Sequence, residues 1–74
     1  MRYEIELWDK KGNMEILGNL DGQAIYRDLK TLKGVLNRLK KAKPLNHYRS
    51  NEYEYRIFCN DKLVLKIDVC DIIQ

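Results

Sequence analysis

The side chains that could carry out catalysis are few in this sequence of 74 residues, and they form no known catalytic pattern. The single histidine, His47, could act as a general base, and the nearby Ser50 or Tyr26 could supply a hydroxyl group. No nucleophile elbow and no glycine-rich phosphate loop accompanies them. We therefore expect residues 45–51 to form a solvated loop, and we expect neither enzymatic activity nor a small-molecule substrate.

The residues that could bind a transition metal are equally sparse. They are Cys59, Cys70 and His47, and the cysteines do not form a Cys-x-x-Cys pair. Because a structural zinc site usually needs four such ligands, the sequence predicts no metal and no cofactor. The two cysteines are instead typical of small, partly buried apolar residues in a reducing compartment.

Localisation follows from the same composition. The sequence contains no apolar signal segment and no run of about eighteen apolar residues that could cross a membrane. We expect a complete cytoplasmic protein that forms a single domain over residues 1–74 and has no membrane partner.

Positive charge is concentrated in one segment. Residues 24–43 hold seven of the fourteen Lys and Arg residues and one of the eleven acids, so this segment carries +6 and the remainder carries −3. Five of these cations project to one face of the helix predicted below, and such a row could follow the phosphates of DNA or RNA. The alternative is a solvated face of an amphipathic helix. The five cations are Arg27, Lys30, Lys33, Arg38 and Lys41.

Gly34 lies in the middle of this basic face. In the exposed interior of a helix, glycine costs about 1 kcal/mol relative to alanine. A backbone without a side chain would let a partner approach closely, so one interpretation of Gly34 is a close-contact position; a tolerated, functionless glycine is the alternative.

The helix itself is predicted over residues 24–43. Asp21 is the expected N-cap, since its carboxylate could accept hydrogen bonds from the first free N–H groups, and Pro44 ends the helix. An apolar stripe at helical spacing predicts the face that covers the core. The stripe comprises Ile25, Leu29, Leu32, Val35, Leu36 and Leu39.

Alternating apolar residues predict two hairpins that flank this helix. The first comprises strands over residues 3–8 and 14–20 with a turn at Gly12, and the second comprises strands over 52–59 and 63–69. A two-residue turn at 60–61 would place Leu63 opposite Phe58, whereas a three-residue loop at 60–62 aligns all the apolar residues on one face. The pattern favours the three-residue loop, and the apolar fourth strand is expected to be central.

The predicted fold is of the α+β class. It has two layers in the order β-β-α-β-β, with one amphipathic helix packed on a four-stranded, mainly antiparallel sheet. The face of the sheet away from the helix then carries several apolar side chains that a single helix leaves in water. They are Trp8, Leu17, Phe58 and Val64.

Two functional hypotheses follow. The first is a small non-enzymatic binding protein, such as an inhibitor or regulator, that contacts another protein or a second copy of itself through Trp8, Leu17, Phe58 and Val64 or through an edge strand. The alternative reading of these apolar residues is that they are dispersed or covered by the chain end. Size alone suggests a phage or mobile-element origin. The second hypothesis is nucleic-acid binding through the basic face of the helix.

Overall fold

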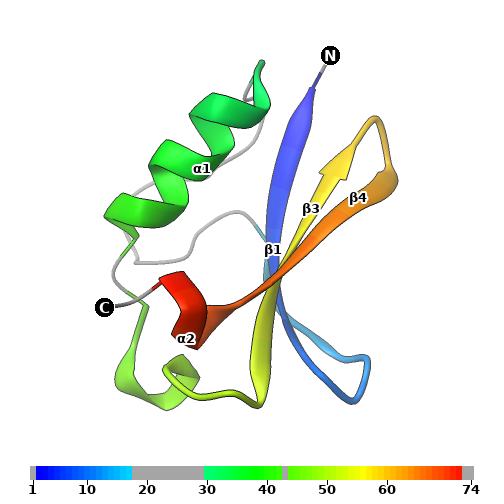
Figure 1. Cartoon of the computed structure of the whole chain (residues 1–74). Coiled ribbons are helices and arrows are strands. Elements are labelled where there is room, and N and C mark those ends of the chain that lie inside the picture. The colour runs from blue at the N-terminus through cyan, green and yellow to red at the C-terminus, as the bar shows by residue number, and fades with distance from the viewer. Residues whose placement is uncertain (1, 18–29, 43, 73–74) are drawn as a thin grey trace.

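The computed structural model of the chain describes residues 2–17, 30–42 and 44–72 (Figure 1). No helix in these three ranges is long and apolar enough to cross a membrane. The elements in chain order are β1 (Tyr3–Asp9), β2 (Met14–Leu17), α1 (Leu32–Lys41), the 3-10 turn η1 (Asn46–Tyr48), β3 (Tyr53–Cys59), β4 (Lys62–Asp68) and the short helix α2 (Val69–Ile72).

The strands form one antiparallel sheet in the order β2-β1-β3-β4. The pairing of β1 with β3 is regular over seven residues, and it places Ile5 opposite Ile57 and Leu7 opposite Tyr55. All four of these side chains are fully buried, as their alternation in the sequence predicts. The predicted α+β class and the four-stranded antiparallel sheet are therefore confirmed.

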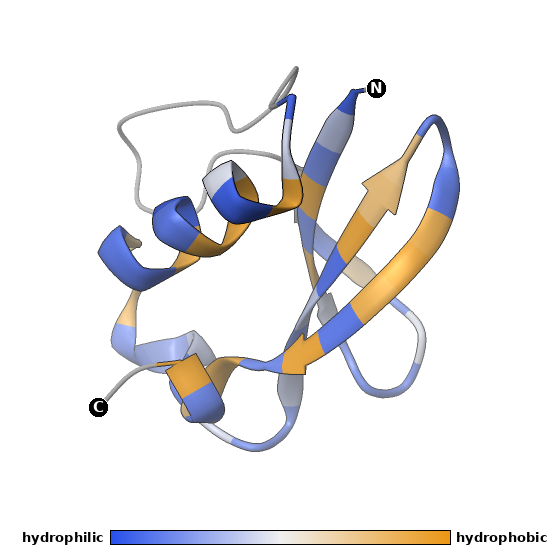
Figure 2. Cartoon of the chain, turned by 45° about the horizontal axis from the view of Figure 1, so that its top comes forward, coloured by the Kyte–Doolittle hydropathy of each residue, from blue (hydrophilic) through white to orange (hydrophobic). Residues whose placement is uncertain are grey.

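The core lies where the buried faces of β1 and β3 meet α1. Val35 and Leu39 of α1 and Val69 of α2 are fully buried in the same cluster as the four strand residues. Figure 2 shows the apolar side of α1 turned toward the sheet and its polar side turned outward. Leu36 is partly buried, while Leu32 is 41% exposed; the predicted stripe positions Ile25 and Leu29 lie outside the described residues.

Helix α1 begins at Leu32, so the prediction of one continuous helix from residue 24 is wrong. Thr31 is extended, with φ −136° and ψ 152°, and its Oγ1 accepts a hydrogen bond from the Gly34 N–H at 3.0 Å. A threonine hydroxyl in this position satisfies one of the free N–H groups of the first turn, and it therefore starts a helix instead of continuing one. The predicted cap Asp21 lies outside the described residues.

The β3–β4 hairpin closes through a two-residue turn, and the predicted three-residue loop is wrong. Cys59 pairs with Lys62, while Asn60 and Asp61 have φ of 52° and 68°, the left-handed conformations of a type I′ turn. The register then shifts at Ile57 and Phe58, which leaves Val64 as an extra residue in β4. This bulge restores the predicted pairing of Ile57 with Leu65 and of Tyr55 with Ile67.

Strand β4 lies at an edge of the described sheet, so the prediction that it is central is also wrong. Its apolar content suggested a strand buried on both sides, but Leu63 and Val64 are exposed and only Leu65 and Ile67 pack against the core. The other central strand, beside β3, is β1. The two strands pair over all seven residues, and the buried side chains of both lie on the same face of the sheet. In addition, β4 ends at Asp68, and the buried Val69 already belongs to α2.

The β1–β2 turn is organised by Asp9. Its Oδ1 accepts hydrogen bonds from the N–H groups of Lys11 and Asn13, both at 2.9 Å, and its Oδ2 accepts one from the Asn13 side chain at 3.0 Å. Gly12 has φ of +100°, which confirms its predicted role in the turn. The pKa of the Asp9 carboxyl is lowered mainly by the backbone N–H of Asn13, because this bond favours the charged form.

Candidate protein-binding surface

The face of the sheet away from α1 carries three rows of paired side chains. The register of β1 and β3 places Glu4 opposite Phe58, Glu6 opposite Arg56 and Trp8 opposite Glu54. On β4, Lys66 lies opposite Arg56 and Asp68 opposite Glu54. Charged side chains therefore occupy the middle of this face, and the large apolar residues lie toward its two ends.

Trp8 is held in a polar cluster at one end. Its indole Nε1 donates a hydrogen bond to Glu6 Oε1 at 2.7 Å, and the guanidinium carbon of Arg56 lies 4.1 Å from the centroid of its ring. Arg56 Nε also donates to Glu54 Oε2 at 2.7 Å. The polar atom of the indole is therefore satisfied, and one face of the ring is covered.

A second, purely apolar group lies at the hairpin end. The two-residue turn places Leu63 opposite Phe58, and the bulge adds Val64 beside them. Leu63 is 43% exposed and Val64 is 51% exposed, while Phe58 is partly buried. We name Phe58, Leu63 and Val64 the hairpin patch. Clustered exposed apolar residues of this kind are typical of sites that contact other proteins.

The predicted interface is thus divided. Phe58 and Val64 are brought together, but Trp8 lies four residues along β1 from Glu4, the residue that pairs with Phe58. At about 3.3 Å per residue this is a separation of roughly 13 Å. Leu17 pairs with Glu6 through its backbone, and its side chain lies outside the described part of the structure.

Leu63 is a surface residue that the sequence pattern missed, because the three-residue loop assigned it to the buried face. The signal that identifies it is the Asn60-Asp61 pair. Asparagine and aspartate adopt left-handed conformations more easily than most residues, and the two-residue turn that they form reverses the facing of Leu63.

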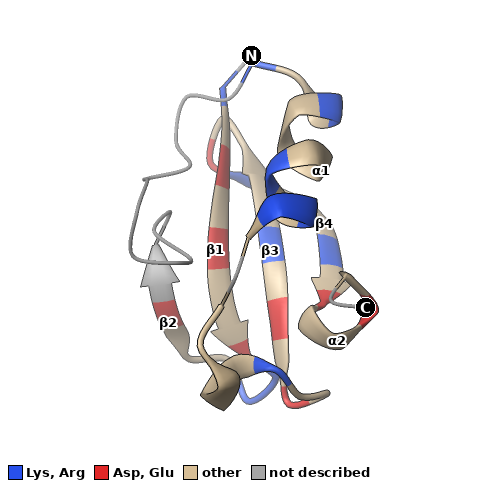
Figure 3. Ribbon diagram, turned by 90° about the vertical axis from the view of Figure 1, so that its left-hand side faces the viewer, with Lys and Arg blue, Asp and Glu red and all other residues tan. Residues whose placement is uncertain are grey.

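The basic face of α1 is shorter than the sequence predicted. Lys33, Arg38 and Lys41 are exposed on the helix, and Lys40, which was absent from the prediction, is exposed beside them (Figure 3). Lys30 precedes the helix, and Arg27 lies outside the described residues. No acidic residue occurs in α1.

Gly34 lies in the first turn of α1, where the glycine has a local explanation. A Cβ added there would lie 3.2 Å from Oγ1 of Thr31, closer than most side-chain contacts. The bare backbone of Gly34 thus accommodates the capping threonine. Close approach of a partner to Gly34 stays a prediction.

The loop that contains His47 forms a ring cluster. Tyr53 Oη lies 3.0 Å from His47 Nε2, and the ring of Tyr48 contacts both side chains at centroid distances of 5.0 and 5.1 Å. Desolvation raises the pKa of Tyr53, and the carboxylate of Glu15 raises it further. Ser50 accepts a hydrogen bond from the Glu52 N–H at 3.2 Å and acts as a turn cap; the other hydroxyl candidate, Tyr26, lies outside the described residues.

Two surface hollows are formed by the described residues. One has a volume of about 290 Å³ and lies between the β1–β2 turn and the start of β3, next to Lys10, Glu52 and Tyr53. The other has a volume of about 560 Å³ and lies between α1 and α2, where it is lined by Leu36, Lys40, Asp71 and Ile72. Within the described ranges, no group of three or more His, Cys, Asp or Glu side chains is arranged to hold a metal ion.

Comparisons with known protein families, with curated proteins and with solved structures found no match.

Proposed function

We propose that this chain is a small non-enzymatic binding protein that docks on another protein, as an inhibitor or regulator does. The observation that carries the proposal is the hairpin patch, in which Leu63 and Val64 are about half exposed beside Phe58. A hydrophobic centre with a polar rim is the usual composition of a protein interface. Here the rim is supplied by Lys66 and Glu4, which lie on the same sheet face as Phe58.

The test is capture of a partner by the immobilised chain, compared between two matched variants. Val64→Ser removes an apolar side chain from the hairpin patch, whereas Leu45→Ser removes one that is 68% exposed in the loop before η1. Val64→Ser is expected to lose the partner and Leu45→Ser to retain it, with both variants keeping the wild-type melting temperature. Equal capture by the two variants would contradict the proposal.

A second copy of the chain is the alternative occupant of the hairpin patch. Burial of Phe58, Leu63 and Val64 between two copies would enlarge a core that is small for a single domain. Sedimentation of the wild type and of Val64→Ser distinguishes this case, since a dimer that uses the patch dissociates in the variant.

Nucleic-acid binding through α1 is the second candidate function. It is supported by the exposed cations Lys33, Arg38, Lys40 and Lys41 on a helix that carries no acid. Each phosphate neutralised releases roughly one counterion, so affinity for DNA or RNA would fall steeply with salt. The double variant Lys40→Glu and Lys41→Glu would lose this binding while Lys11→Glu, at an exposed turn position, would keep it.

The proposal includes two features of the whole chain. One is the complete β-β-α-β-β order in two layers, in which the helix covers one sheet face and leaves the other available; burial of Val35 and Leu39 supports it. The other is a cytoplasmic location, which the two free cysteines, Cys59 and the exposed Cys70, support because exposed thiols persist in a reducing compartment.

A further inference from the structure

Strand β4 has one open side in the described sheet. It pairs with β3, and no other described strand lies against it. The backbone N–H and C=O groups on the open side of such a strand are available to an additional strand. Figure 1 shows β4 at the outside of the sheet, and it continues directly into α2.

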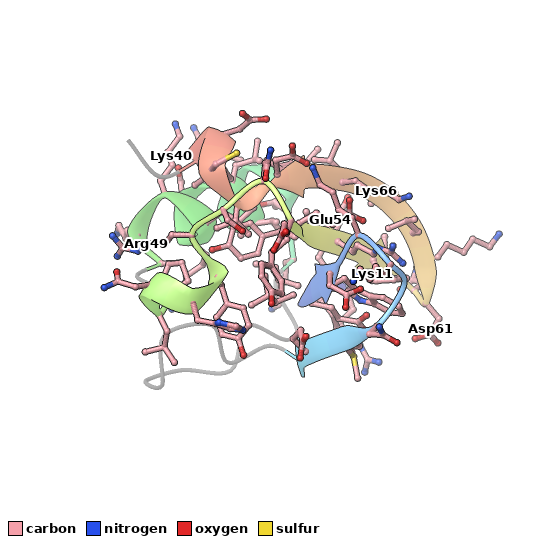
Figure 4. All side chains as sticks on the ribbon, turned by 90° about the horizontal axis from the view of Figure 1, so that it is seen from below. Lys11, Lys40, Arg49, Glu54, Asp61 and Lys66 are labelled. Atoms are coloured by element: carbon pink, nitrogen blue, oxygen red, sulfur yellow. The ribbon has the colours of Figure 1, made fainter. Side chains whose placement is uncertain are left out.

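Lys66 marks the centre of the regular part of this edge. It is exposed and lies opposite Arg56 on β3, and like charges in directly opposite positions are destabilising. Arg56 already forms an ion pair with Glu54. Lys66 makes no ion pair or hydrogen bond with another described residue. Figure 4 shows Lys66 on β4, well separated from Lys40 on α1. An acidic side chain on the open side would therefore balance an uncompensated charge.

The neighbours of Lys66 along the strand are apolar. Leu65 and Ile67 alternate with it, face the core and are only partly buried. The adjoining α2 borders the hollow of about 560 Å³, whose apolar walls are Leu36 and Ile72. Apolar side chains that enter from an added strand would cover Leu65 and Ile67 on this side of the sheet.

A second copy of β4 fits this edge poorly. The bulge at Val64 interrupts the alternation of side chains along β4. Only residues 65–68 therefore form a regular stretch that could pair with a second copy. Pairing that stretch with its copy so that Leu65 lies opposite Ile67 also places Lys66 opposite Lys66. The lysine therefore opposes self-association and selects a partner of opposite charge.

We propose that the β4 edge binds an extended segment of a partner protein as a fifth strand, with an acidic residue opposite Lys66 and apolar residues opposite Leu65 and Ile67. This inference rests on the proposed function. It adds the chemistry of the partner segment that the chain would bind. The hairpin patch lies at one end of the same strand, so a partner that adds a strand to β4 can also cover Leu63 and Val64.

The test uses the isotope-labelled full chain and two synthetic peptides, one of alternating Glu and Val and one of alternating Lys and Val. The Glu peptide is expected to slow amide hydrogen exchange within residues 65–68 by at least tenfold, and the Lys peptide is expected to leave it unchanged. Lys66→Glu should reverse this preference, while the matched variant Lys11→Glu should preserve it. Unchanged exchange in β4 at saturating peptide, or perturbation confined to α1, would overturn the inference.

Failure of this inference is distinguishable from failure of the proposed function. If the peptides leave β4 unprotected but Val64→Ser still abolishes capture of the partner, strand addition is overturned and docking through the hairpin patch stands. If neither Val64→Ser nor Lys66→Glu changes the capture of a partner, both proposals are overturned.

Discussion

The guanidinium carbon of Arg56 lies 4.1 Å from the centroid of the Trp8 ring, on the sheet face away from α1. The same side chain donates a hydrogen bond from Nε to Glu54, which is 7% exposed. One arginine therefore covers the largest aromatic side chain of that face and neutralises a buried carboxylate. Trp8 is thus partly covered, whereas Leu63 and Val64 are exposed at the hairpin end of the sheet.

Replacement of Arg56 should be costly. Arg56→Ala leaves the Glu54 carboxylate buried without its ion-pair partner and uncovers the Trp8 ring, so we expect a loss of about 2 kcal/mol in the free energy of unfolding. Urea unfolding followed by Trp8 fluorescence measures the effect. The control Lys66→Ala, at the exposed position opposite Arg56, should change stability by less than about 0.5 kcal/mol. Equal effects of the two substitutions would contradict the structural role of Arg56.

The N-cap of α1 gives a second prediction. Thr31→Ala removes the acceptor of the Gly34 N–H and should cost about 1 kcal/mol, whereas Thr31→Ser should retain most of the stability. Gly34→Ala should gain less than the roughly 1 kcal/mol typical of an exposed helix interior, because its Cβ would lie 3.2 Å from Thr31 Oγ1. Thermal unfolding followed by circular dichroism checks all three variants. An unchanged melting temperature in Thr31→Ala would contradict the assignment of Thr31 as the N-cap of α1.

The β3–β4 turn makes a third prediction. Asp61 has φ of 68°, a conformation that glycine adopts without steric cost, so Asp61→Gly should stabilise the chain by about 0.5 kcal/mol. Asp61→Val should destabilise it by about 1–2 kcal/mol, because a β-branched residue strongly disfavours positive φ. Chemical denaturation of the two variants measures the difference. If both substitutions had the same effect, the two-residue turn would be contradicted.

The lowered pKa of Asp9 predicts how the stability of the chain depends on pH. Its folded-state pKa is lowered, chiefly by the Asn13 N–H, so its contribution is fully present above the ordinary carboxyl pKa of about 4 and is lost as pH falls through the lower folded value. We expect the urea midpoint to decrease on acidification below about pH 4. Asp9→Asn removes this titration, so the variant should show a shallower decrease. An identical acid profile in wild type and variant would contradict the assignment.

Sequence patterns predicted those parts of the fold that short-range alternation determines. Ile5, Leu7, Tyr55 and Ile57 alternate strictly, and each is buried as expected, because a strand that is exposed on one face permits a single assignment of its side chains. The start of α1 was missed because apolar spacing continues through Thr31, and a single side-chain hydrogen bond to the Gly34 N–H outweighs that periodicity.

The residues of the candidate surface could not be predicted from the alternation of apolar and polar residues alone. A bulge adds one residue at Val64 and reverses the facing of Leu63, so the apolar patch differs from the one that strict alternation predicts. Likewise, cross-strand register decides that Trp8 and Phe58 lie at opposite ends of the sheet face. The edge position of β4 also depends on long-range pairing, to which its own apolar composition contributes little.

The most direct measurement of the central claim is an affinity capture with the immobilised chain at low and at high salt, with every retained species identified. Docking through the hairpin patch predicts a protein that is retained at both salt concentrations by the wild type and lost by Val64→Ser. Retention of nucleic acid alone, at low salt only and equally by Val64→Ser, would contradict the claim.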